Sequence, residues 1–254
     1  LSKLKGKYMT DTMEAAVLHG AKDIRVERFQ MPDLLPGMVL LKIKRVGICG
    51  SDLHYFEDGY CGAFVPTRPF VLGHELTAEV IAVNGNAANM PVVGARVTVN
   101  PTRACGYCDY CKSGHGNLCR NTIMLGSGST IPPTDGAMAE FVTVRADQCH
   151  VLPAGMDDGF GAMIEPLAVG LHAIKQAGTV SGKRILVTGG GTIGLLTAVT
   201  AKAFGSVAVV VSDIVEERRQ SALECGVDFV LNPLDRNFQR QVKDITGDGF
   251  DVIF

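Results

Sequence analysis

The sequence predicts an α/β protein in which an all-β-rich domain precedes a doubly wound parallel sheet. Three observations support this fold class. Short strands with alternating apolar residues fill residues 13–152, a repeat of strand and helix begins near Gly182, and a glycine-rich turn joins the first strand and helix of that repeat. Because 254 residues exceed the size of a typical domain, we expect two domains, each with its own hydrophobic core.

The first domain is predicted to be a compact, barrel-like β-domain. Its strand segments are separated by Gly, Pro and Asn turns and read MVLLKIKRVGI, ELTAEVIAV, ARVTVN and AEFVTV. The first strand pattern begins only at Met13, so we expect residues 1–8 to be an added segment ahead of a native start at Met9. We therefore assign residues 9–164 to this domain.

The second domain is predicted to consist of βαβ units over residues 165–254. EPLAVGLHAIKQAG (165–178) has the apolar spacing of a helix, and RILVTG, VAVVVSD, DFVLN and DVIF then indicate strands separated by helix-length segments. Alternation at this spacing is typical of a parallel sheet. A doubly wound dinucleotide domain contains two βαβαβ halves, and only the first is present, so we expect the natural protein to continue beyond Phe254.

The charge pattern argues against macromolecular partners. The formal net charge is −2, and Lys and Arg are scattered rather than clustered, unlike a surface that binds nucleic acid or an anionic membrane. No apolar run reaches the roughly 18 residues of a membrane span, and the N-terminus lacks the apolar core of a signal peptide. The sequence thus predicts a cytoplasmic enzyme that acts on a small molecule.

Four of the eight cysteines lie close together, in the pattern CxxCxxCx7C inside NPTRACGYCDYCKSGHGNLCR. Without a secretory signal these thiols stay reduced, which favours metal binding over disulfides. Turns with two intervening residues allow one short loop to surround a tetrahedral Zn²⁺ ion. An iron–sulfur cluster uses the same ligands, and a surface loop with incidental thiols is the non-functional alternative. We predict a structural zinc site formed by Cys105, Cys108, Cys111 and Cys119.

A second set of metal-ligand residues is dispersed along the chain. Cys49 lies in VGICGSDLHYF, His74 and Glu75 lie in VLGHE, and Glu165 lies in IEPLAVGLH. One thiolate, one imidazole and a carboxylate suit a catalytic zinc that keeps one coordination position open. Each residue alone has a plainer interpretation: a buried small side chain for Cys49, a core histidine for His74 and a helix N-terminal charge for Glu165.

A glycine-rich motif predicts the nucleotide site. Gly189, Gly191 and Gly194 form GxGxxG in RILVTGGGTIGLL, between a predicted strand and a predicted helix. Glycines there allow the backbone to approach a pyrophosphate at the helix N-terminus, and we expect Ile193 to contact the cofactor. Asp213 ends the next strand, where its carboxylate can accept hydrogen bonds from ribose hydroxyls. Because that carboxylate repels a 2′-phosphate, we expect NAD rather than NADP.

The motifs CGSDLH, GHE, the four-cysteine loop and GGGTIG, in this order, resemble the zinc-containing medium-chain alcohol dehydrogenases from about Met13 onward. CGSDLHYFEDG, PFVLGHE, QCHVLP and EPLAVGLHAIKQAG are most similar to the polyol branch of that family. The resemblance implies a GroES-like β-barrel catalytic domain and a Rossmann nucleotide domain. It also implies two zinc ions per subunit, NAD as cofactor, and a homodimer or homotetramer.

The resemblance assigns roles to individual residues. It implies that Cys49, His74 and Glu75 are ligands of the catalytic zinc. Glu165 would contact the ion directly or through its water, next to the substrate. Asp52, three positions after Cys49, would orient His74 from behind.

The resemblance also assigns a proton path and two binding contacts. Ser51 would accept the alcohol proton and pass it towards His54, while Tyr55 would line the substrate pocket. Arg218 would pack beside the adenosine of NAD. An arginine at this offset can also accommodate the 2′-phosphate of NADP, and its plainer interpretation is a solvated helix charge.

The expected reaction is the zinc-dependent, NAD-linked oxidation of a secondary hydroxyl of a sugar acid or polyol, with L-idonate to 5-keto-D-gluconate as the leading case. Ionising an alcohol of pKa about 16 at neutral pH costs about 12 kcal/mol, and zinc lowers the pKa of a bound oxygen to about 7. Sorbitol, xylitol and threonine are alternative substrates. L-Idonate needs a cationic partner, which the sequence does not identify; Arg68 is a candidate only by its proximity to the GHE segment. The alternative from another class is a noncatalytic module that binds zinc and NAD. Such a module is expected to lack Ser51, His54 or one of the zinc ligands, and all of these residues are present here.

Overall fold

The computed structural model describes residues 11–86 and 90–254, so the expectation for residues 1–8 lies outside the described part of the chain. The chain divides into two compact units, with the boundary between Glu165 and Pro166. Each unit contains its own clusters of buried apolar residues. Among the described helices, none is long and apolar enough to cross a membrane.

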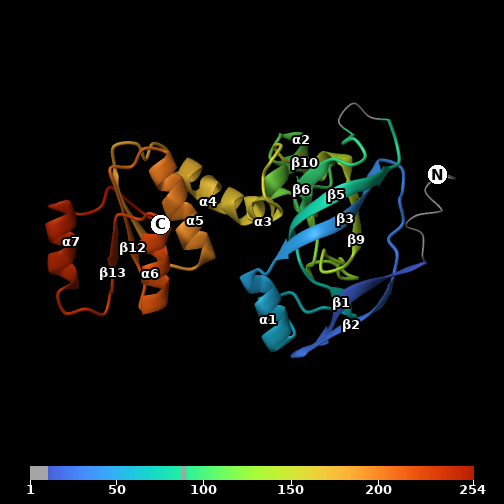
Figure 1. Cartoon of the computed structure of the whole chain (residues 1–254), viewed down its shortest axis with the longest axis horizontal. Helices are drawn as coiled ribbons and strands as arrows, with labels where there is room; N and C mark the ends of the chain where they lie inside the picture. The colour runs from blue at the N-terminus through green and yellow to red at the C-terminus, as the bar shows by residue number, and fades with distance from the viewer. Residues whose placement is uncertain (1–10, 87–89) are drawn as a thin grey trace. The chain divides into compact units, whose positions relative to one another are not determined.

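The first unit consists mainly of antiparallel β-sheet (Figure 1). A five-stranded sheet has the order β10-β6-β5-β3-β9, and a three-stranded sheet has the order β2-β1-β4. The larger sheet contains β3 (Met38–Gly47), β5 (Glu75–Val83), β6 (Arg96–Val99), β9 (Phe141–Arg145) and β10 (Cys149–Val151). The smaller sheet contains β1 (Thr12–Gly20), β2 (Asp23–Gln30) and β4 (Phe70–Val71). The predicted all-β-rich domain is confirmed.

The alternating apolar residues of these strands form the core. Val39 and Leu41, two positions apart on β3, are fully buried and belong to one cluster with Val80 of β5 and Val97 of β6. This period of two is the pattern from which the strands were predicted. Burial of one such side chain contributes about 1.5–3 kcal/mol, so the core fixes the strand ends that carry the candidate site.

Short helices and one ribbon connect the strands of the first unit. α1 (Gly50–Asp58) follows β3, α2 (Asp109–Lys112) lies in the four-cysteine loop, and α3 (Asp158–Ala162) precedes the boundary. The strands β7 (Thr102–Arg103) and β8 (Ile123–Met124) pair antiparallel. They therefore close the base of the four-cysteine loop.

The second unit is a parallel sheet with the order β13-β12-β11-β14; Figure 1 labels β12 and β13 of this sheet. In chain order this is 3-2-1-4, the order of the doubly wound dinucleotide fold. The strands are β11 (Arg184–Thr188), β12 (Ala208–Ser212), β13 (Phe229–Leu231) and β14 (Val252–Ile253). The helices are α4 (Ile164–Ala177), α5 (Thr192–Ala203), α6 (Glu216–Glu224) and α7 (Phe238–Thr246).

Helices cover both faces of this sheet, as the predicted fold class requires. Ile185 and Val187 of β11 cluster with Ile174 of α4 and with buried residues of α5 and α6. Leu186, between them in sequence, belongs to a different cluster that contains Phe238 of α7. Because successive residues of a strand face opposite sides, the two clusters lie on opposite faces.

Candidate metal centres and nucleotide-binding turn

The dispersed metal-ligand residues converge at one end of the five-stranded sheet. Cys49 follows the end of β3 by two positions, and Glu75 is the first residue of β5. β3 and β5 run antiparallel with Gly47 paired to Glu75, so the end of one strand lies beside the start of the other. One ligand atom each of Cys49, His74 and Glu75 lie within 4.8 Å of one another. We refer to these three residues as the three-ligand cluster.

Asp52 holds the two chain segments of the cluster together. Its carboxylate accepts hydrogen bonds from the N–H of Cys49 at 2.9 Å and from the N–H of Gly73 at 3.2 Å. Asp52 and His74 are each 3% exposed, and His74 Nδ1 is buried without a hydrogen-bond partner, 4.0 Å from Asp52 Oδ1. A buried, unpaired ring nitrogen that faces a carboxylate is the arrangement found behind metal-bound histidines.

Gly47 leaves room for the carboxylate of the cluster. A Cβ atom at this position would collide with the Glu75 carboxylate and lie only 3.1 Å from the Glu75 Cβ. Any larger residue at Gly47 therefore displaces Glu75. No sequence motif marks Gly47, because its role depends on the neighbouring strand.

Electrostatic interactions in the cluster favour a thiolate beside the imidazole. A hydrogen bond to His74 holds the pKa of the Cys49 thiol below its usual value. Burial lowers the pKa of His74, but the hydrogen bond to Cys49 and the charge of Asp52 outweigh burial and raise it overall. Burial raises the pKa of Glu75. The cluster thus gathers acidic groups in a poorly solvated place, which a bound divalent cation would neutralise.

Glu165 lies near the three-ligand cluster, in the first turn of α4. Burial raises its pKa, the charge of His74 opposes that shift, and the charge of Glu75 adds to it. The group of atoms within 4.8 Å contains no atom of Glu165. Glu165 is therefore close enough to interact electrostatically, and its direct or water-mediated metal contact stays a prediction.

Ser51 and His54 lie three positions apart on α1, the spacing of neighbours on one helix face. Ser51 contributes to the lowered pKa of the Cys49 thiol, after the larger effect of His74. The His54 side chain is exposed, with its Nδ1 3.5 Å from Asp58 Oδ2. The helix thus places Ser51 at the cluster and His54 towards solvent.

Tyr55 is placed differently from the sequence-based prediction. It is 2% exposed and packs edge-to-face against Phe70, with ring centroids 5.4 Å apart. Its hydroxyl oxygen accepts a hydrogen bond of 2.9 Å from the N–H of Gly128. Tyr55 is therefore a core residue of the first unit, and this placement argues against the expected substrate contact. A residue on a helix beside a site can face either inward or outward, and the motif alone did not distinguish the two.

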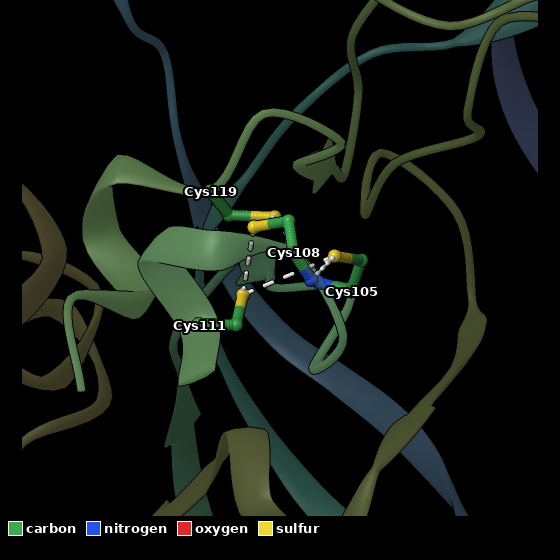
Figure 2. A group of neighbouring side chains, drawn as sticks. All are labelled: Cys105, Cys108, Cys111 and Cys119. Atoms are coloured by element: carbon green, nitrogen blue, oxygen red, sulfur yellow. Dashed lines mark hydrogen bonds between the residues drawn. The ribbon is translucent and has the colours of Figure 1, made fainter. Parts of the chain in front are cut away.

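The four cysteines of the loop converge as well (Figure 2). Three sulfur–sulfur distances are 3.9 Å for Cys105 and Cys111, 3.5 Å for Cys108 and Cys111, and 4.0 Å for Cys108 and Cys119. Sulfur atoms around tetrahedral Zn²⁺, with bonds of about 2.3 Å, lie about 3.8 Å apart, whereas a disulfide brings them to about 2.05 Å. All eight cysteines are free. The spacing fits four ligands of one ion.

Backbone N–H groups point at these sulfur atoms. The N–H of Cys105 donates to Cys119 Sγ at 3.2 Å, and the N–H of Cys108 donates to Cys105 Sγ at 3.4 Å. Burial opposes ionisation of Cys105, yet the N–H donors of Tyr107 and Cys108 lower its pKa to about 6. Burial and the neighbouring thiols raise the pKa of Cys111 to about 12. Ionising one thiol disfavours ionisation of the next, and a divalent cation removes that conflict.

Polar contacts hold the rest of the loop. Arg120 makes a two-pronged hydrogen bond to Asp109, at 3.0 and 2.9 Å, and lies 4.9 Å from the centre of the Tyr110 ring. His115 Nδ1 lies 3.1 Å from Ser113 Oγ. His115 is thus engaged by Ser113, and the four sulfur atoms form the donor set without it.

The GxGxxG turn connects β11 to α5, and Gly191 caps the N-terminus of α5. Gly189 has a φ of 98°, which favours glycine, and a Cβ at Gly194 would collide with the carbonyl oxygen of Gly189. A Cβ at Gly191 would meet no atom within 4 Å, so the backbone there is open to a ligand. Ile193 in the first turn of α5 is 43% exposed. The turn has the shape that a pyrophosphate needs.

Asp213 fastens this turn. Its Oδ2 accepts from the N–H of Gly190 at 2.7 Å and its Oδ1 from the N–H of Val215 at 2.8 Å, and both bonds lower its pKa. Arg218 lies 3.6 Å from Oδ2, and Arg219, which sequence reasoning missed, donates to the Asp213 carbonyl at 2.6 Å. A carboxylate has about four acceptor sites, but the Asp213 side chain is only 4% exposed, and its contact with a ribose stays a prediction.

Arg68 does not offer a free cation to a substrate. Its guanidinium donates to Asp135 at 2.8 and 3.3 Å and to the carbonyls of Pro69 and Pro133. The ion pair with Asp135 argues against the sequence-based suggestion that Arg68 meets a substrate carboxylate. Proximity in sequence to the GHE segment did not place the guanidinium at the cluster.

Comparison with known proteins gives the family. Residues 35–154 match the model of the alcohol dehydrogenase GroES-like domain, and residues 192–254 match that of zinc-binding dehydrogenase. The chain is 38% identical to sorbitol dehydrogenase of Bacillus subtilis (strain 168) over 241 residues, which cover 94% of this chain and 67% of that protein.

Solved structures agree with this assignment. L-Idonate 5-dehydrogenase from Escherichia coli str. K-12 substr. MG1655 superposes with a TM-score of 0.87 at 34% identity, covering 96% of this chain and 68% of that one. A Sinorhizobium meliloti 1021 protein bound to NADP superposes with a TM-score of 0.83 at 32% identity, covering 96% and 69%. The chain spans about two thirds of the length of these relatives. It belongs to the zinc-containing medium-chain alcohol dehydrogenases, in their polyol branch.

Proposed function

We propose that the protein oxidises a secondary hydroxyl group of a polyol or sugar acid to the ketone, using zinc and NAD. The observation that carries the proposal is the three-ligand cluster, whose donor atoms lie within 4.8 Å of one another. A thiolate, an imidazole and a carboxylate form the donor set of a zinc site that keeps one position open for substrate.

Two zinc ions fit the residues that are present. Cys49, His74 and Glu75 would hold the catalytic ion, and the four loop cysteines, with sulfur spacings of 3.5 to 4.0 Å, would hold a structural one. When bound, the catalytic zinc supplies a Lewis acid that lowers the pKa of an alcohol, and NAD supplies the hydride acceptor.

The chain's own residues would position the reactants and move the proton. Asp52 lies behind His74 and would orient its ring. Ser51, at the cluster, would take the proton of the alcohol and pass it to His54, whose exposed ring can release it to water. Glu165 would add a carboxylate beside the reacting group.

The glycine turn would hold the cofactor. Open backbone at Gly191 and the exposed Ile193 would receive NAD, while Asp213 and Arg218 would bind the adenosine ribose. We favour NAD because Asp213 repels a 2′-phosphate, but the similar Sinorhizobium meliloti protein is bound to NADP, so both cofactors belong in the test.

The substrate is proposed within a narrow class. Similarity to an L-idonate 5-dehydrogenase structure supports L-idonate, and similarity to curated sorbitol dehydrogenases supports a neutral polyol. The engagement of Arg68 by Asp135 removes the one cation suggested for the carboxylate of L-idonate. For this reason we propose sorbitol-type polyols before L-idonate as the substrate.

A substrate panel tests the proposal. Zinc-loaded protein is supplied with NAD or NADP and with L-idonate, sorbitol, xylitol or threonine, and reduction of the cofactor is followed by absorbance. We expect turnover with NAD and at least one polyol or with L-idonate. Protein that retains zinc and binds NAD but reduces no cofactor with any of these alcohols would contradict the proposal.

The family resemblance leads us to propose further that residues 9–164 form the catalytic domain, that residues 165–254 belong to the nucleotide domain, and that the protein assembles as a homodimer or homotetramer. Light scattering coupled to size-exclusion chromatography checks the assembly. A monomer at micromolar concentration would contradict that part.

A further inference from the structure

A cavity of about 620 Å³ lies beside the four-cysteine loop, in the first unit. Its wall contains Arg103 at the end of β7, Tyr107, Arg120 and Asn121 of the loop, Thr130, and Arg145 at the end of β9. The residues of the three-ligand cluster are not part of this wall. The wall includes Cys105 of the four-cysteine site, but the proposed hydride-transfer chemistry does not use the cavity.

The wall of the cavity is cationic. It contains three arginines and no Asp or Glu. Arg120 is engaged by Asp109, and Arg145 is engaged by Asp147 at 2.9 Å. For Arg103, no described carboxylate lies within ion-pair distance, and the side chain is half-buried. An unpaired, half-buried guanidinium in the same wall as two paired ones is a place where an anion is stabilised.

The remaining wall suits a hydroxylated molecule. Asn121 and Thr130 contribute polar side chains to the wall. Asn121 Nδ2 donates to Cys105 Sγ at 3.9 Å, and Thr130 Oγ1 donates to the Pro132 carbonyl at 2.9 Å and lies 2.9 Å from Thr134 Oγ1, so these contacts orient both side chains. Tyr107 is 66% exposed and presents an aromatic face of the kind that packs against sugar rings. The volume lies within the range of small-molecule sites and far exceeds a single oxyanion.

We propose that this cavity binds the phosphate group of a small phosphorylated molecule, with Arg103 as the principal ligand. A guanidinium binds phosphate through two parallel N–H···O bonds, which an ammonium or an amide cannot reproduce. The phosphate can come from a sugar phosphate or from the free ion, and the room beside Arg103 favours the sugar phosphate.

Calorimetry on the zinc-loaded chain tests the proposal. Glucose 6-phosphate, inorganic phosphate and glucose are titrated into the parent protein, into Arg103→Gln, and into Arg28→Gln as a control. Arg28 is an exposed residue of β2, outside the cavity wall. A lost charge-assisted, bidentate contact weakens binding by about tenfold to hundredfold.

We expect glucose 6-phosphate to bind to the parent and to Arg28→Gln equally, about tenfold or more weakly to Arg103→Gln, and glucose not to bind. If inorganic phosphate binds as tightly as glucose 6-phosphate, the result supports a phosphate site and identifies the free ion as its ligand. Binding of glucose as tight as that of its phosphate, or an Arg103→Gln variant that binds like the parent, would overturn the proposal. Unchanged unfolding temperature and zinc content of Arg103→Gln exclude a folding defect as the cause of weaker binding.

Discussion

The two candidate metal sites use similar ligand atoms but are constructed in different ways. The three-ligand cluster joins residues from β5 and from the segments before β5 and α1, and its His74 and Glu75 are 3% and 6% exposed. The four-cysteine site lies within one loop, from Cys105 to Cys119, and its four cysteines are half-buried. One site is made by the sheet, and the other by a short stretch of chain.

The difference indicates how each site depends on the fold. Apolar packing of β3 and β5 already brings Cys49 beside Glu75, so the metal is not needed to assemble that end of the sheet. The four-cysteine loop contains few buried side chains, so a bound ion would contribute most of the free energy that stabilises its fold. Removing a ligand should therefore affect chemistry at the first site and stability at the second.

Replacing Cys49 by Ser should produce the largest effect. We expect loss of about one zinc ion per chain and a fall in turnover of at least about 1,000-fold, because the Lewis acid is lost. Unfolding free energy should change little. Metal analysis and steady-state kinetics measure this, with Cys225→Ser, an exposed thiol, as the matched control. Turnover within tenfold of the parent would contradict the assignment.

Replacing Cys108 by Ser should act mainly on stability. Loss of a structural zinc ligand is expected to lower the free energy of unfolding by about 3 kcal/mol or more. Denaturant unfolding with and without a chelator measures this: the chelator should destabilise the parent and leave the variant unchanged. Ser113→Ala in the same loop serves as the control. Equal unfolding midpoints for parent and Cys108→Ser would show that the loop holds without metal.

Replacing Gly47 by Ala tests whether the cluster depends on space made by a neighbouring strand. The added Cβ would collide with the Glu75 carboxylate. We expect zinc affinity of the cluster to fall about 10- to 100-fold, with the four-cysteine site unaffected. Chelator competition measures the affinity. At Gly20, where a Cβ meets no atom within 4 Å, the same change should leave zinc affinity unaltered; a similar loss at both glycines would refute the steric explanation.

The smallest expected effect is on the stability of the nucleotide turn, which is held by the Asp213 carboxylate and contains, among its described residues, no candidate metal ligand set. The Val215 and Gly190 N–H groups lower the pKa of Asp213 in the folded state. A lowered folded pKa contributes stability that is present above the ordinary Asp value of about 3.9 and is lost as pH falls through the folded value.

Asp213→Asn should therefore be less stable than the parent near neutral pH, and the difference should shrink as pH falls below the ordinary Asp value and through the lowered folded value. Chemical denaturation at several pH values measures it, with Asp244→Asn, an exposed carboxylate of α7, as the control. A difference between Asp213→Asn and the parent that stays constant with pH would argue against the hydrogen-bonded carboxylate as its cause.

The sequence by itself determined the features that depend on neighbouring residues. Alternating apolar positions predicted the strands, CxxCxxCx7C predicted the loop site, and GxGxxG between a strand and a helix predicted the nucleotide turn, because each pattern acts over a few residues. The dispersed ligands Cys49, His74 and Glu75 were grouped by family resemblance, since nothing in their spacing joins them.

Only the tertiary structure decided which side chains face the cluster and which face the core. In the structure, Tyr55 packs edge-to-face against Phe70, and Arg68 forms an ion pair with Asp135. Gly47 leaves the space that the Glu75 carboxylate occupies. These outcomes depend on contacts between strands and loops far apart in the chain. Local pattern carries no information about them, because the direction of a side chain is set by the surface against which its element packs.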